Sequence, residues 1–271
     1  MRTIAHLSDL HFGRINPAII IPLISMISDL EPDVIAVSGD LTQRARSHQF
    51  KEARAFLDAL PKPQIVVPGN HDVPLHNVVT RFLAPLKKYR EYVTDDLAPS
   101  YADSEIVILG VNTARSLTIK GGRINRRQVR WLKEQFYTGG PSVVKIVVTH
   151  HPVDSSEGSD ARYLVGRARM AMEELAGCGA DLFLAGHMHI SYAGQTAKRY
   201  KLGGKTAIVI HAGTASSTRS RGESNSFNVI RITYPEIAIE RHRWHPTENT
   251  FIGELSDRFR RANTGWIRIE I

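Results

Sequence analysis

Cysteine is nearly absent from this sequence: Cys178 is the only one among 271 residues. A single thiol excludes a disulfide framework within one chain and a structural metal site built from several thiolates. Long apolar runs are missing too. The longest candidate, residues 17–27, is interrupted by Pro22 and is shorter than the roughly 18 residues that a membrane span requires. Residues near Met1 do not pair an apolar run with a small-residue cleavage site. We therefore expect a cytoplasmic protein with no membrane span.

The composition is that of a globular protein, with 42% hydrophobic and 23% charged residues. Thirty-five Lys and Arg residues against 27 Asp and Glu give a net charge of +8, which favours anionic partners such as phosphate esters. Dense basic runs occur only at 87–88 and 258–261, and we expect both on solvated helix faces. No aromatic residues interleave with them to stack on bases, so nucleic acid is not the expected partner. Without repeats or long linkers, residues 1–271 are expected to form a single domain.

Strand-like and helical segments alternate over the first two thirds of the chain. Short, continuous apolar runs such as residues 33–38 are typical of strands that are covered on both faces. We expect strands at 2–8, 33–38, 64–67, 105–111, 143–149 and 181–185. Helices are expected at 17–30, 48–60, 125–136 and 163–175, the second of them capped by Ser47.

After Gly186 the pattern changes to a period of two, which predicts antiparallel strands at 190–197, 206–211, 226–233 and 237–243. A series of βαβ units followed by a run of strands indicates an α/β (α+β) fold. In it, two packed mixed β-sheets are flanked by helices as a four-layer αββα sandwich. Residues 267–271 alternate like an edge strand, which could close a sheet or pair with a second chain in a homodimer.

Residue types that bind metals follow five of the expected strands. Because the carboxyl ends of parallel strands meet at one edge of a sheet, these side chains are expected to share one site. A single histidine after a strand is more often an ordinary loop residue. Five such clusters in succession instead indicate that their side chains belong to one site. Carboxylates, imidazoles and an amide without cysteine suit divalent ions such as Mn, Fe or Zn. The clusters are Asp9 and His11; Asp40; Asn70, His71 and Asp72; His150 and His151; and His187 and His189.

The spacing within these clusters has a physical reason. Asp9 and His11 are two residues apart, as are His187 and His189, and such pairs project to the same side of an extended chain. Each pair can therefore converge on one small volume. Glycines stand just before ligand candidates, where a missing side chain lets the backbone turn sharply or approach an ion. They are Gly39, Gly69 and Gly186.

The five ordered motifs, which span residues 9–189, resemble those of the calcineurin-like metallophosphoesterases. This resemblance implies two divalent metal ions per chain. One would be held by Asp9, His11, Asp40 and His189, and the other by Asp40, Asn70, His150 and His187. Asp40 would then lie between the two ions. The resemblance places the ligand first in the His-His-Pro step, so His150 is preferred to His151, which we expect in a supporting or core position.

The same resemblance implies a mechanism in which metal-activated hydroxide attacks phosphorus. His71 would contact the phosphate and protonate the leaving oxygen, and Asn70 would lie beside the substrate. Asp72 would orient His71 or a metal ligand during catalysis, or it could cap the following turn. Arg14 and Arg44 follow ligand motifs closely, and their guanidinium groups could bind a substrate phosphate.

The chain as a whole, with residues 222–228, resembles the bacterial branch that contains cyclic-nucleotide phosphodiesterases. We therefore expect a phosphoric diester hydrolase that acts on cyclic nucleotides. Alternative substrates are a glycerophosphodiester, a phosphomonoester or a nucleotide-sugar lipid precursor. The lipid substrate would require an apolar lid, and 78–86 and 163–172 are candidates, although both fit plain amphipathic helices better. A non-catalytic binding protein should have lost ligands, and this chain has lost none.

The sequence allows two positions for one further segment. Residues 214–221 (TASSTRSR) combine small and basic residues after an expected strand. They could line the site or form a surface loop.

Overall fold

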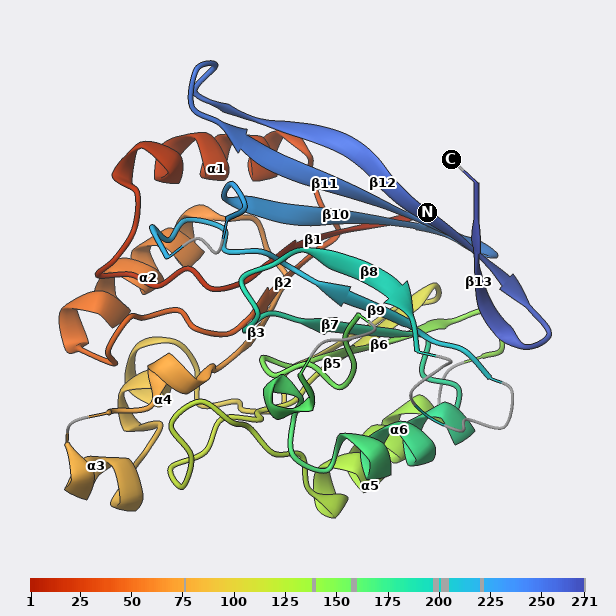
Figure 1. The fold of residues 1–271 in the computed structure, drawn as a ribbon, viewed down its shortest axis with the longest axis horizontal. Helices are drawn as coiled ribbons and strands as arrows, with labels where there is room; N and C mark the ends of the chain where they lie inside the picture. The colour runs from red at the N-terminus through yellow and green to blue at the C-terminus, as the bar shows by residue number, and fades with distance from the viewer. Residues whose placement is uncertain are drawn as a thin grey trace.

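The computed structural model describes residues 1–75, 77–137, 140–156, 160–196, 200, 205–219 and 222–270. In this part of the chain two β-sheets pack face to face, with helices against their outer faces (Figure 1). The expected αββα sandwich is therefore confirmed. Among the described residues, no helix combines the length and the apolar character that crossing a membrane demands.

One sheet has seven strands. They are β1 (Arg2–Leu7), β2 (Val34–Ser38), β3 (Gln64–Val67), β10 (Ser226–Thr233), β11 (Glu236–His245), β12 (Thr250–Ala262) and β13 (Gly265–Ile269). Their order is β13-β12-β11-β10-β1-β2-β3, in which β1, β2 and β3 are parallel and the other neighbours are antiparallel. The edge strand β13 also reaches the second sheet, because Arg268 donates to the carbonyl oxygen of Ala193 at 2.6 Å. Pairing of this edge with a second chain stays a prediction.

The other sheet has six strands. They are β4 (Ser100–Ala102), β5 (Ile106–Gly110), β6 (Val144–Val148), β7 (Leu182–Ala185), β8 (Tyr192–Gln195) and β9 (Ile208–His211). Their order is β4-β5-β6-β7-β9-β8. The expectation that residues 206–211 form an antiparallel strand is confirmed for the pairing with β8, but this strand has a second neighbour. Strand β9 is antiparallel to β8 but parallel to β7, so the βαβ region and the later strands share one sheet.

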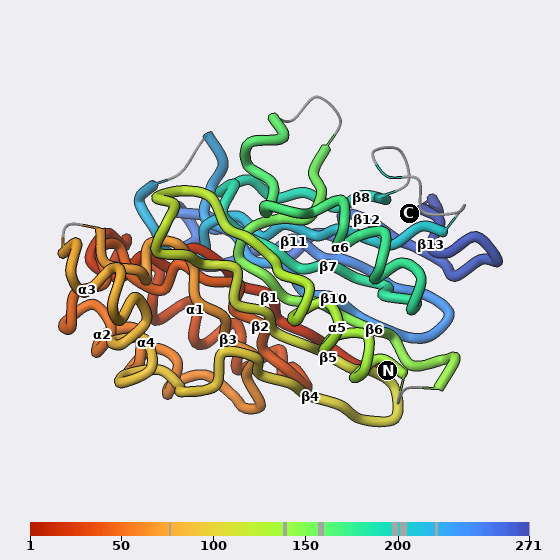
Figure 2. Tube along the Cα trace, turned by 90° about the horizontal axis from the view of Figure 1, so that it is seen from below, coloured from red at the N-terminus to blue at the C-terminus, as the bar shows by residue number. Residues whose placement is uncertain are grey.

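The described residues form six α-helices, five of which cover the outer faces of the sheets. The six helices are α1 (Pro17–Asp29), α2 (Ser47–Ala59), α3 (Val78–Leu83), α4 (Lys87–Tyr92), α5 (Arg126–Phe136) and α6 (Ala168–Gly177), with short 3-10 turns at Asn70–Asp72 and Ala161–Tyr163. Helices α1, α2 and α4 pack on the seven-stranded sheet, and α5 and α6 pack on the other. In both views α2, α3 and α4 lie at one end of the molecule and β13 at the other (Figures 1 and 2).

The core between the sheets explains the continuous apolar runs. Ile4, Val34 and Val67 from one sheet belong to the same buried cluster as Ile146 and Leu184 from the other. The opposite faces of the same strands pack against helices, so both faces of these strands are buried. A strand in this position has no solvated face on which polar residues could alternate.

Three local expectations were wrong. Residues 258–261 lie in β12 and not on a helix, because their basic side chains alternate along the strand and pair across it, as Arg258 and Arg260 do with Glu236. Helix α6 begins at Ala168 because Arg167 adopts a left-handed conformation with φ 71°. Ser47 is the first residue of α2 and not its cap.

His211 at the end of β9 makes the fold sensitive to acid. Its side chain is 2% exposed and donates from Nε2 to the carbonyl oxygen of Asp154 at 2.9 Å. Burial lowers the pKa of His211 from 6.5 to about 4. The unfolded chain therefore binds a proton here at pH values where the folded chain does not, and stability falls as the pH drops from 6.5 towards 4.

We expect this histidine to remove on the order of 3 kcal/mol from the free energy of unfolding between pH 7 and pH 4. Urea unfolding of the wild type and of His211→Gln across that range measures the effect. Gln can keep the hydrogen bond to Asp154 but does not titrate. The free energy of unfolding of the variant should therefore fall less steeply on acidification. The slopes of the two proteins against pH should differ by the equivalent of up to one bound proton. Equal slopes for the two proteins would rule out this role.

Candidate metal centre

The loops that follow β1, β2, β3, β6 and β7 meet at the carboxyl ends of these strands. They bring together all seven side chains that the sequence suggested as metal ligands. In Figure 1 the carboxyl end of β1 points towards the end of the molecule that carries α2, α3 and α4. The seven residues are Asp9, His11, Asp40, Asn70, His150, His187 and His189.

The first group consists of Asp9, His11, Asp40 and His189, all of them buried, with one ligand atom from each lying within 4.8 Å of the others. Nε2 of His189 is 3.0 Å from Oδ1 of Asp9 and 3.2 Å from Nε2 of His11. Nε2 of His11 is 3.7 Å from Oδ2 of Asp40. Two imidazoles and two carboxylates thus converge on one small volume.

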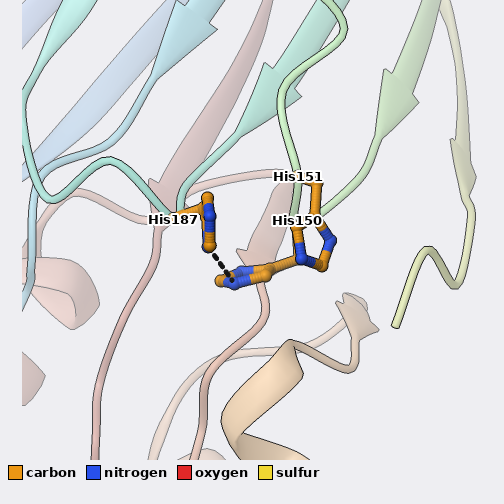
Figure 3. Close-up of side chains that lie close together, drawn as sticks. All are labelled: His150, His151 and His187. Carbon is orange, nitrogen blue, oxygen red and sulfur yellow. Dashed lines mark hydrogen bonds between the residues drawn. The ribbon is translucent and has the colours of Figure 1, made fainter. Parts of the chain in front are cut away.

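The second group surrounds Nε2 of His150. This atom lies 3.1 Å from Oδ1 of Asn70, 3.4 Å from Oδ1 of Asp40 and 3.3 Å from Nδ1 of His187. Figure 3 shows the rings of His150 and His187 meeting at the dashed line. The two carboxylate oxygens of Asp40 therefore face different groups, with Oδ2 towards His11 and Oδ1 towards His150.

The hydrogen bonds behind these rings decide which ring nitrogens carry a lone pair. Nδ1 of His189 lies 2.9 Å from the carbonyl oxygen of Arg219, and Nδ1 of His150 lies 2.8 Å from that of Ser38. A carbonyl only accepts, so each Nδ1 carries the proton and each Nε2 presents a lone pair to the site. Oδ1 of Asp9 is buried and accepts no hydrogen bond. Acceptor atoms that face one another in this way fit divalent cations, which they would hold through nitrogen and oxygen.

The backbone is strained at five of the seven residues. Asp9, His11, Asp40, His187 and His189 have φ values of 53°, 53°, 52°, 70° and 58°, in the left-handed region that residues with a Cβ atom avoid. Each such residue costs about 1–2 kcal/mol. Strain of this kind is kept where the surroundings impose it and is concentrated at functional sites.

All three glycines before the ligand candidates are required by close packing. A Cβ atom on Gly69 would overlap Oδ1 of Asp40. A Cβ atom on Gly186 would overlap the side chains of Ser8 and Asp9. A Cβ atom on Gly39 would lie 2.7 Å from Nδ1 of His150, and Gly39 also has a φ of 85°. All three positions agree with the expectation that the backbone passes close to the site here.

Charge within the centre is unevenly distributed. Burial, followed by the nearby carboxylates of Asp9 and Asp72, raises the pKa of Asp40 well above its ordinary value. Burial acts in the same direction on Asp9, but the neighbouring imidazoles of His189 and His11 outweigh it and lower the pKa of Asp9. Two carboxylates this close repel each other, and positive charge between them would favour the ionised form of both.

His151 lies beside His150, with the ring centroids 4.8 Å apart. Both of its ring nitrogens have protein partners, Oγ1 of Thr113 at 2.9 Å and the carbonyl oxygen of Lys120 at 3.1 Å. One of its nitrogens still lies within 4.8 Å of ligand atoms of His150 and His187. The supporting position expected for His151 is consistent with these contacts and stays a prediction.

Asp72 is buried, and its carboxylate joins two of the loops. It accepts hydrogen bonds from the backbone of Gly69 (2.9 Å), Leu41 (3.1 Å) and Thr42 (2.9 Å), and from the hydroxyl of Thr42 (3.0 Å). These bonds hold the loop that carries Asp40 against the turn that carries Asn70. Asp72 can therefore orient metal ligands without touching a substrate.

His71 lies at the edge of the first group, with its ring 4.9 Å from that of His11. Its Nδ1 donates to the carbonyl oxygen of Gln43 at 2.9 Å, and its Nε2 lies 3.0 Å from Nη1 of Arg219, which donates to it. Burial, then the charge of His11, lowers the pKa of His71 to about 3. The imidazole is thus neutral, with its free nitrogen covered by Arg219.

Arg219 is the functional candidate that the sequence did not single out. It lies in the segment 214–221, of which residues 220 and 221 fall outside the described part of the chain. In the sequence, Arg219 is one of two arginines in a segment of small residues. Nothing in that segment distinguishes Arg219 from Arg221. The structure turns this segment towards the site, since Oγ1 of Thr214 donates to the carbonyl oxygen of Asp9 at 2.7 Å.

Arg14 and Arg44 differ in how they meet the site. Nη1 of Arg44 lies 3.4 Å from Nδ1 of His71, whereas the side chain of Arg14 is exposed. Burial lowers the pKa of Arg219, the carboxylates of Asp40 and Asp9 act against this, and the charges of Arg14 and Arg44 add to it. Arg44 and Arg219 therefore both contact His71 beside the ligand groups.

A family model for calcineurin-like phosphoesterases matches residues 2–191. The glycerophosphodiester phosphodiesterase GpdQ of Enterobacter lignolyticus is 26% identical over 168 residues, which cover 55% of this chain and 57% of that protein. A cAMP/cGMP dual specificity phosphodiesterase of Mycobacterium tuberculosis is 28% identical over 175 residues, 60% of this chain and 51% of that protein. The chain thus spans little more than half the length of these relatives.

Solved structures share the fold. A dimetal phosphatase from Danio rerio superposes with a TM-score of 0.66 at 14% identity, covering 93% of this chain and 98% of that one. A purple acid phosphatase from yellow lupin superposes with a TM-score of 0.68 at 11% identity, covering 95% of this chain and 53% of that one. At such identities the likeness concerns the two-sheet sandwich and its helices.

Proposed function

The chain belongs to the calcineurin-like phosphoesterase family, and from this premise we propose that it hydrolyses phosphodiesters with two divalent metal ions. The observation that carries the proposal is the position of Asp40. Its two oxygens face two separate groups of acceptor atoms, at 3.7 Å from Nε2 of His11 and 3.4 Å from Nε2 of His150. A carboxylate placed in this way can bridge two cations. Each cation would be Mn, Fe or Zn, all of which accept nitrogen and oxygen ligands.

The two ligand groups share Asp40 and differ in their other residues. One ion would be held by Asp9, His11, Asp40 and His189, and the other by Asp40, Asn70, His150 and His187. When bound, two such cations supply the Lewis acidity that polarises phosphoryl oxygens and activates water for in-line attack on phosphorus. The amide oxygen of Asn70 adds no charge to its group, so the second ion would keep more of its positive charge for an anionic substrate.

The chain's own groups then orient the phosphodiester. His71, Arg44 and Arg219 lie on one side of the centre and present imidazole and guanidinium groups to it. A substrate oxygen can take the place of Nε2 of His71 as the acceptor for Arg219. Nε2 of His71 would then be free to contact the leaving oxygen. Because Nε2 carries a lone pair, it would first take up a proton from water and then pass that proton to the leaving oxygen. Asp72 would act through the loops that it holds and not on the substrate.

We expect Arg219→Ala to lower kcat/KM about tenfold to a hundredfold, the size of a lost hydrogen bond between charged groups. The metal content should not change, because it is the backbone carbonyl of Arg219, and not its side chain, that contacts His189. Steady-state kinetics with metal analysis of the same samples measures both. Arg46→Ala removes an exposed arginine near the site and serves as the control. Equal loss in the two variants, or none in Arg219→Ala, would contradict the assignment.

For the substrate we propose cyclic nucleotides. The support is the whole-chain resemblance described above, together with the similarity to a relative named as a cAMP/cGMP phosphodiesterase. A second candidate is a glycerophosphodiester, which is favoured by the relatives named GpdQ, at 26% and 28% identity. A phosphodiester group at two metal ions is common to both, so the choice depends on what the rest of the substrate contacts.

Hydrolysis by metal-free protein reloaded with Mn tests the proposal. The substrates are a bis(aryl) phosphodiester, an aryl monophosphate, 3′,5′- and 2′,3′-cyclic AMP, and glycerophosphocholine, with Asp40→Ala as the blank. Turnover of the diester and of a cyclic nucleotide, absent from the blank, is the expected result. Diester turnover with only glycerophosphocholine accepted would move the substrate to the second candidate. Absence of turnover with Mn, Fe and Zn alike would contradict the enzymatic function.

A further inference from the structure

Helix α3 exposes its apolar side chains to solvent. The exposed fractions of Val78, Val79, Phe82 and Leu83 are 62%, 68%, 52% and 82%. The expectation that residues 78–86 form a plain amphipathic helix with a buried apolar face is therefore wrong for α3. Two residues of the loop after β5 add to this surface, Leu117 at 69% and Ile119 at 62% exposure. We call these six residues the α3 surface.

The α3 surface is held in place by a buried arginine. Arg81 is 6% exposed and donates to the carbonyl oxygens of Pro74, Ser116 and Thr118, at 2.9, 2.7 and 2.5 Å. Its guanidinium therefore fastens α3 to the loop that carries Leu117 and Ile119. Four apolar side chains thus face outwards because the one long polar side chain of α3 faces inwards. This is the reverse of the arrangement in a helix that covers a core.

The same loop connects the α3 surface to the metal centre. The carbonyl oxygen of Ile119 accepts a hydrogen bond from Nδ2 of Asn70 at 3.3 Å, and that of Lys120 lies 3.1 Å from Nε2 of His151. The α3 surface is therefore at the end of the molecule where the metal-ligand loops lie, as the position of α3 in Figure 1 also shows. Whatever the α3 surface binds is brought close to the centre.

The charge around the α3 surface has one sign. Residues 73–90, which include α3, contain four Lys or Arg and no Asp or Glu, and the neighbouring loop of residues 111–120 adds Arg115 and Lys120 and no acidic residue. Lys87, Arg90 and Arg115 line one groove of about 630 Å³ together with Leu83. None of these three cations pairs with a carboxylate among the residues that the structure describes. Exposed apolar side chains thus lie next to unpaired positive charge.

We propose that the α3 surface binds an anionic lipid membrane. Side chains that are more than half exposed project from the protein and do not enclose a small molecule, and such projections can insert among acyl chains. The cations in the neighbouring groove would meet phosphate groups of the lipids, as basic residues near a membrane surface do. A second copy of the chain fits less well, because a symmetric contact through this surface would bring the positive segments of both copies together.

This inference goes beyond the proposed function and does not depend on it. It implies that the end of the molecule that carries the metal-ligand loops lies near the membrane surface when the protein is bound. Phosphoesters in the lipid layer, or released from it, would then reach the centre over a short path. Membrane binding itself needs neither substrate nor turnover, so it is measured separately.

Co-sedimentation of the full chain with sucrose-loaded vesicles tests the proposal. One set of vesicles mixes phosphatidylglycerol with phosphatidylcholine, and the other contains phosphatidylcholine alone. The test variant is Val79→Glu with Leu83→Glu, and the matched control is Ile21→Glu, which alters an apolar residue of α1 that is 78% exposed. Because all three positions are exposed, the substitutions should not disturb the core, and the thermal unfolding of each protein checks this.

The wild type and Ile21→Glu should partition to the anionic vesicles and far less to the neutral ones. The double variant should lose at least tenfold in partition coefficient while hydrolysing a soluble phosphodiester at the wild-type rate. Equal partition of the double variant and the wild type would overturn the proposal. So would a wild type that stays in the supernatant with both kinds of vesicle. A double variant that loses only self-association, measured by light scattering, would instead identify a second copy as the occupant.

Discussion

Asp40→Ala is expected to lose at least roughly a thousandfold in kcat/KM for a phosphodiester, because several kcal/mol of transition-state stabilisation by metal ions corresponds to such a factor. Asp40 faces both ligand groups, so its removal weakens both sites at once. Its Oδ1 also accepts a hydrogen bond from the backbone of His71 at 2.8 Å, which holds the turn that carries Asn70. Metal content measured by mass spectrometry, beside kinetics, should fall together with activity.

Two comparisons make this result specific. Asp40→Asn keeps the size of the side chain and an oxygen acceptor but removes the negative charge that favours a bridge between cations. It should retain more metal than Asp40→Ala while staying far below wild-type activity. Asp58→Ala, an exposed carboxylate on α2, should change neither quantity. Two equivalents of metal bound to Asp40→Ala at wild-type affinity would refute the bridging role.

His71→Ala is expected to lower turnover by about a hundredfold to ten-thousandfold, the usual contribution of a proton-transferring group, while both metal ions stay bound. The imidazole is next to the ligand groups but its nitrogens are occupied by Gln43 and Arg219. The decrease should appear in kcat more than in metal affinity. It should be smaller for a substrate with a strongly acidic leaving alcohol, because that oxygen needs little protonation.

Kinetics with two aryl phosphodiesters of different leaving-group pKa, beside metal analysis, distinguishes this role from a structural one. His48→Ala is the matched control, since His48 is exposed on α2 and is not one of the metal-ligand candidates. If His71→Ala keeps wild-type turnover with both substrates, the role in protonation is wrong. If it loses metal in proportion to activity, His71 supports the centre and does not act on the leaving group.

The order of the layers and the location of the site follow from patterns that the sequence displays directly. Continuous apolar runs predict strands that are buried on both faces, and ligand types at their ends predict where these strands deliver side chains. The pattern worked because β1, β2 and β3 are parallel in one sheet, β6 and β7 are parallel in the other, and the loops after both sets meet at the same end of the sandwich. Neither the strands nor the location of the site depends on exactly how the side chains pack in the core.

Other features depend on tertiary contacts that no local pattern encodes. Residues 206–211 alternate like a hairpin strand, but whether β9 also pairs with β7 depends on the sheet into which it folds. Arg219 contacts His71 across 148 residues of chain, and no spacing rule connects the two. The left-handed conformations of Asp9 and Asp40 are likewise imposed by their surroundings, since aspartate has no strong preference for them.

The orientation of helix α3 could not be predicted from the sequence for a different reason. Its sequence contains one arginine among apolar residues, and the ordinary interpretation is that the apolar residues face the core. The orientation is reversed because Arg81 finds three carbonyl acceptors inside. Periodicity describes which side chains share a face, but it does not say which face is buried when the partners of a charged residue lie in a distant loop.

Anomalous X-ray diffraction from crystals of the metal-free protein soaked in Mn²⁺ tests the two-metal centre most directly. We predict two peaks on either side of Asp40, one beside Asp9, His11 and His189 and the other beside Asn70, His150 and His187. Each oxygen of Asp40 should then lie within coordination distance of a different ion. A single peak, or a second peak between His151 and His187 with no contact to Asp40, would contradict the centre described here.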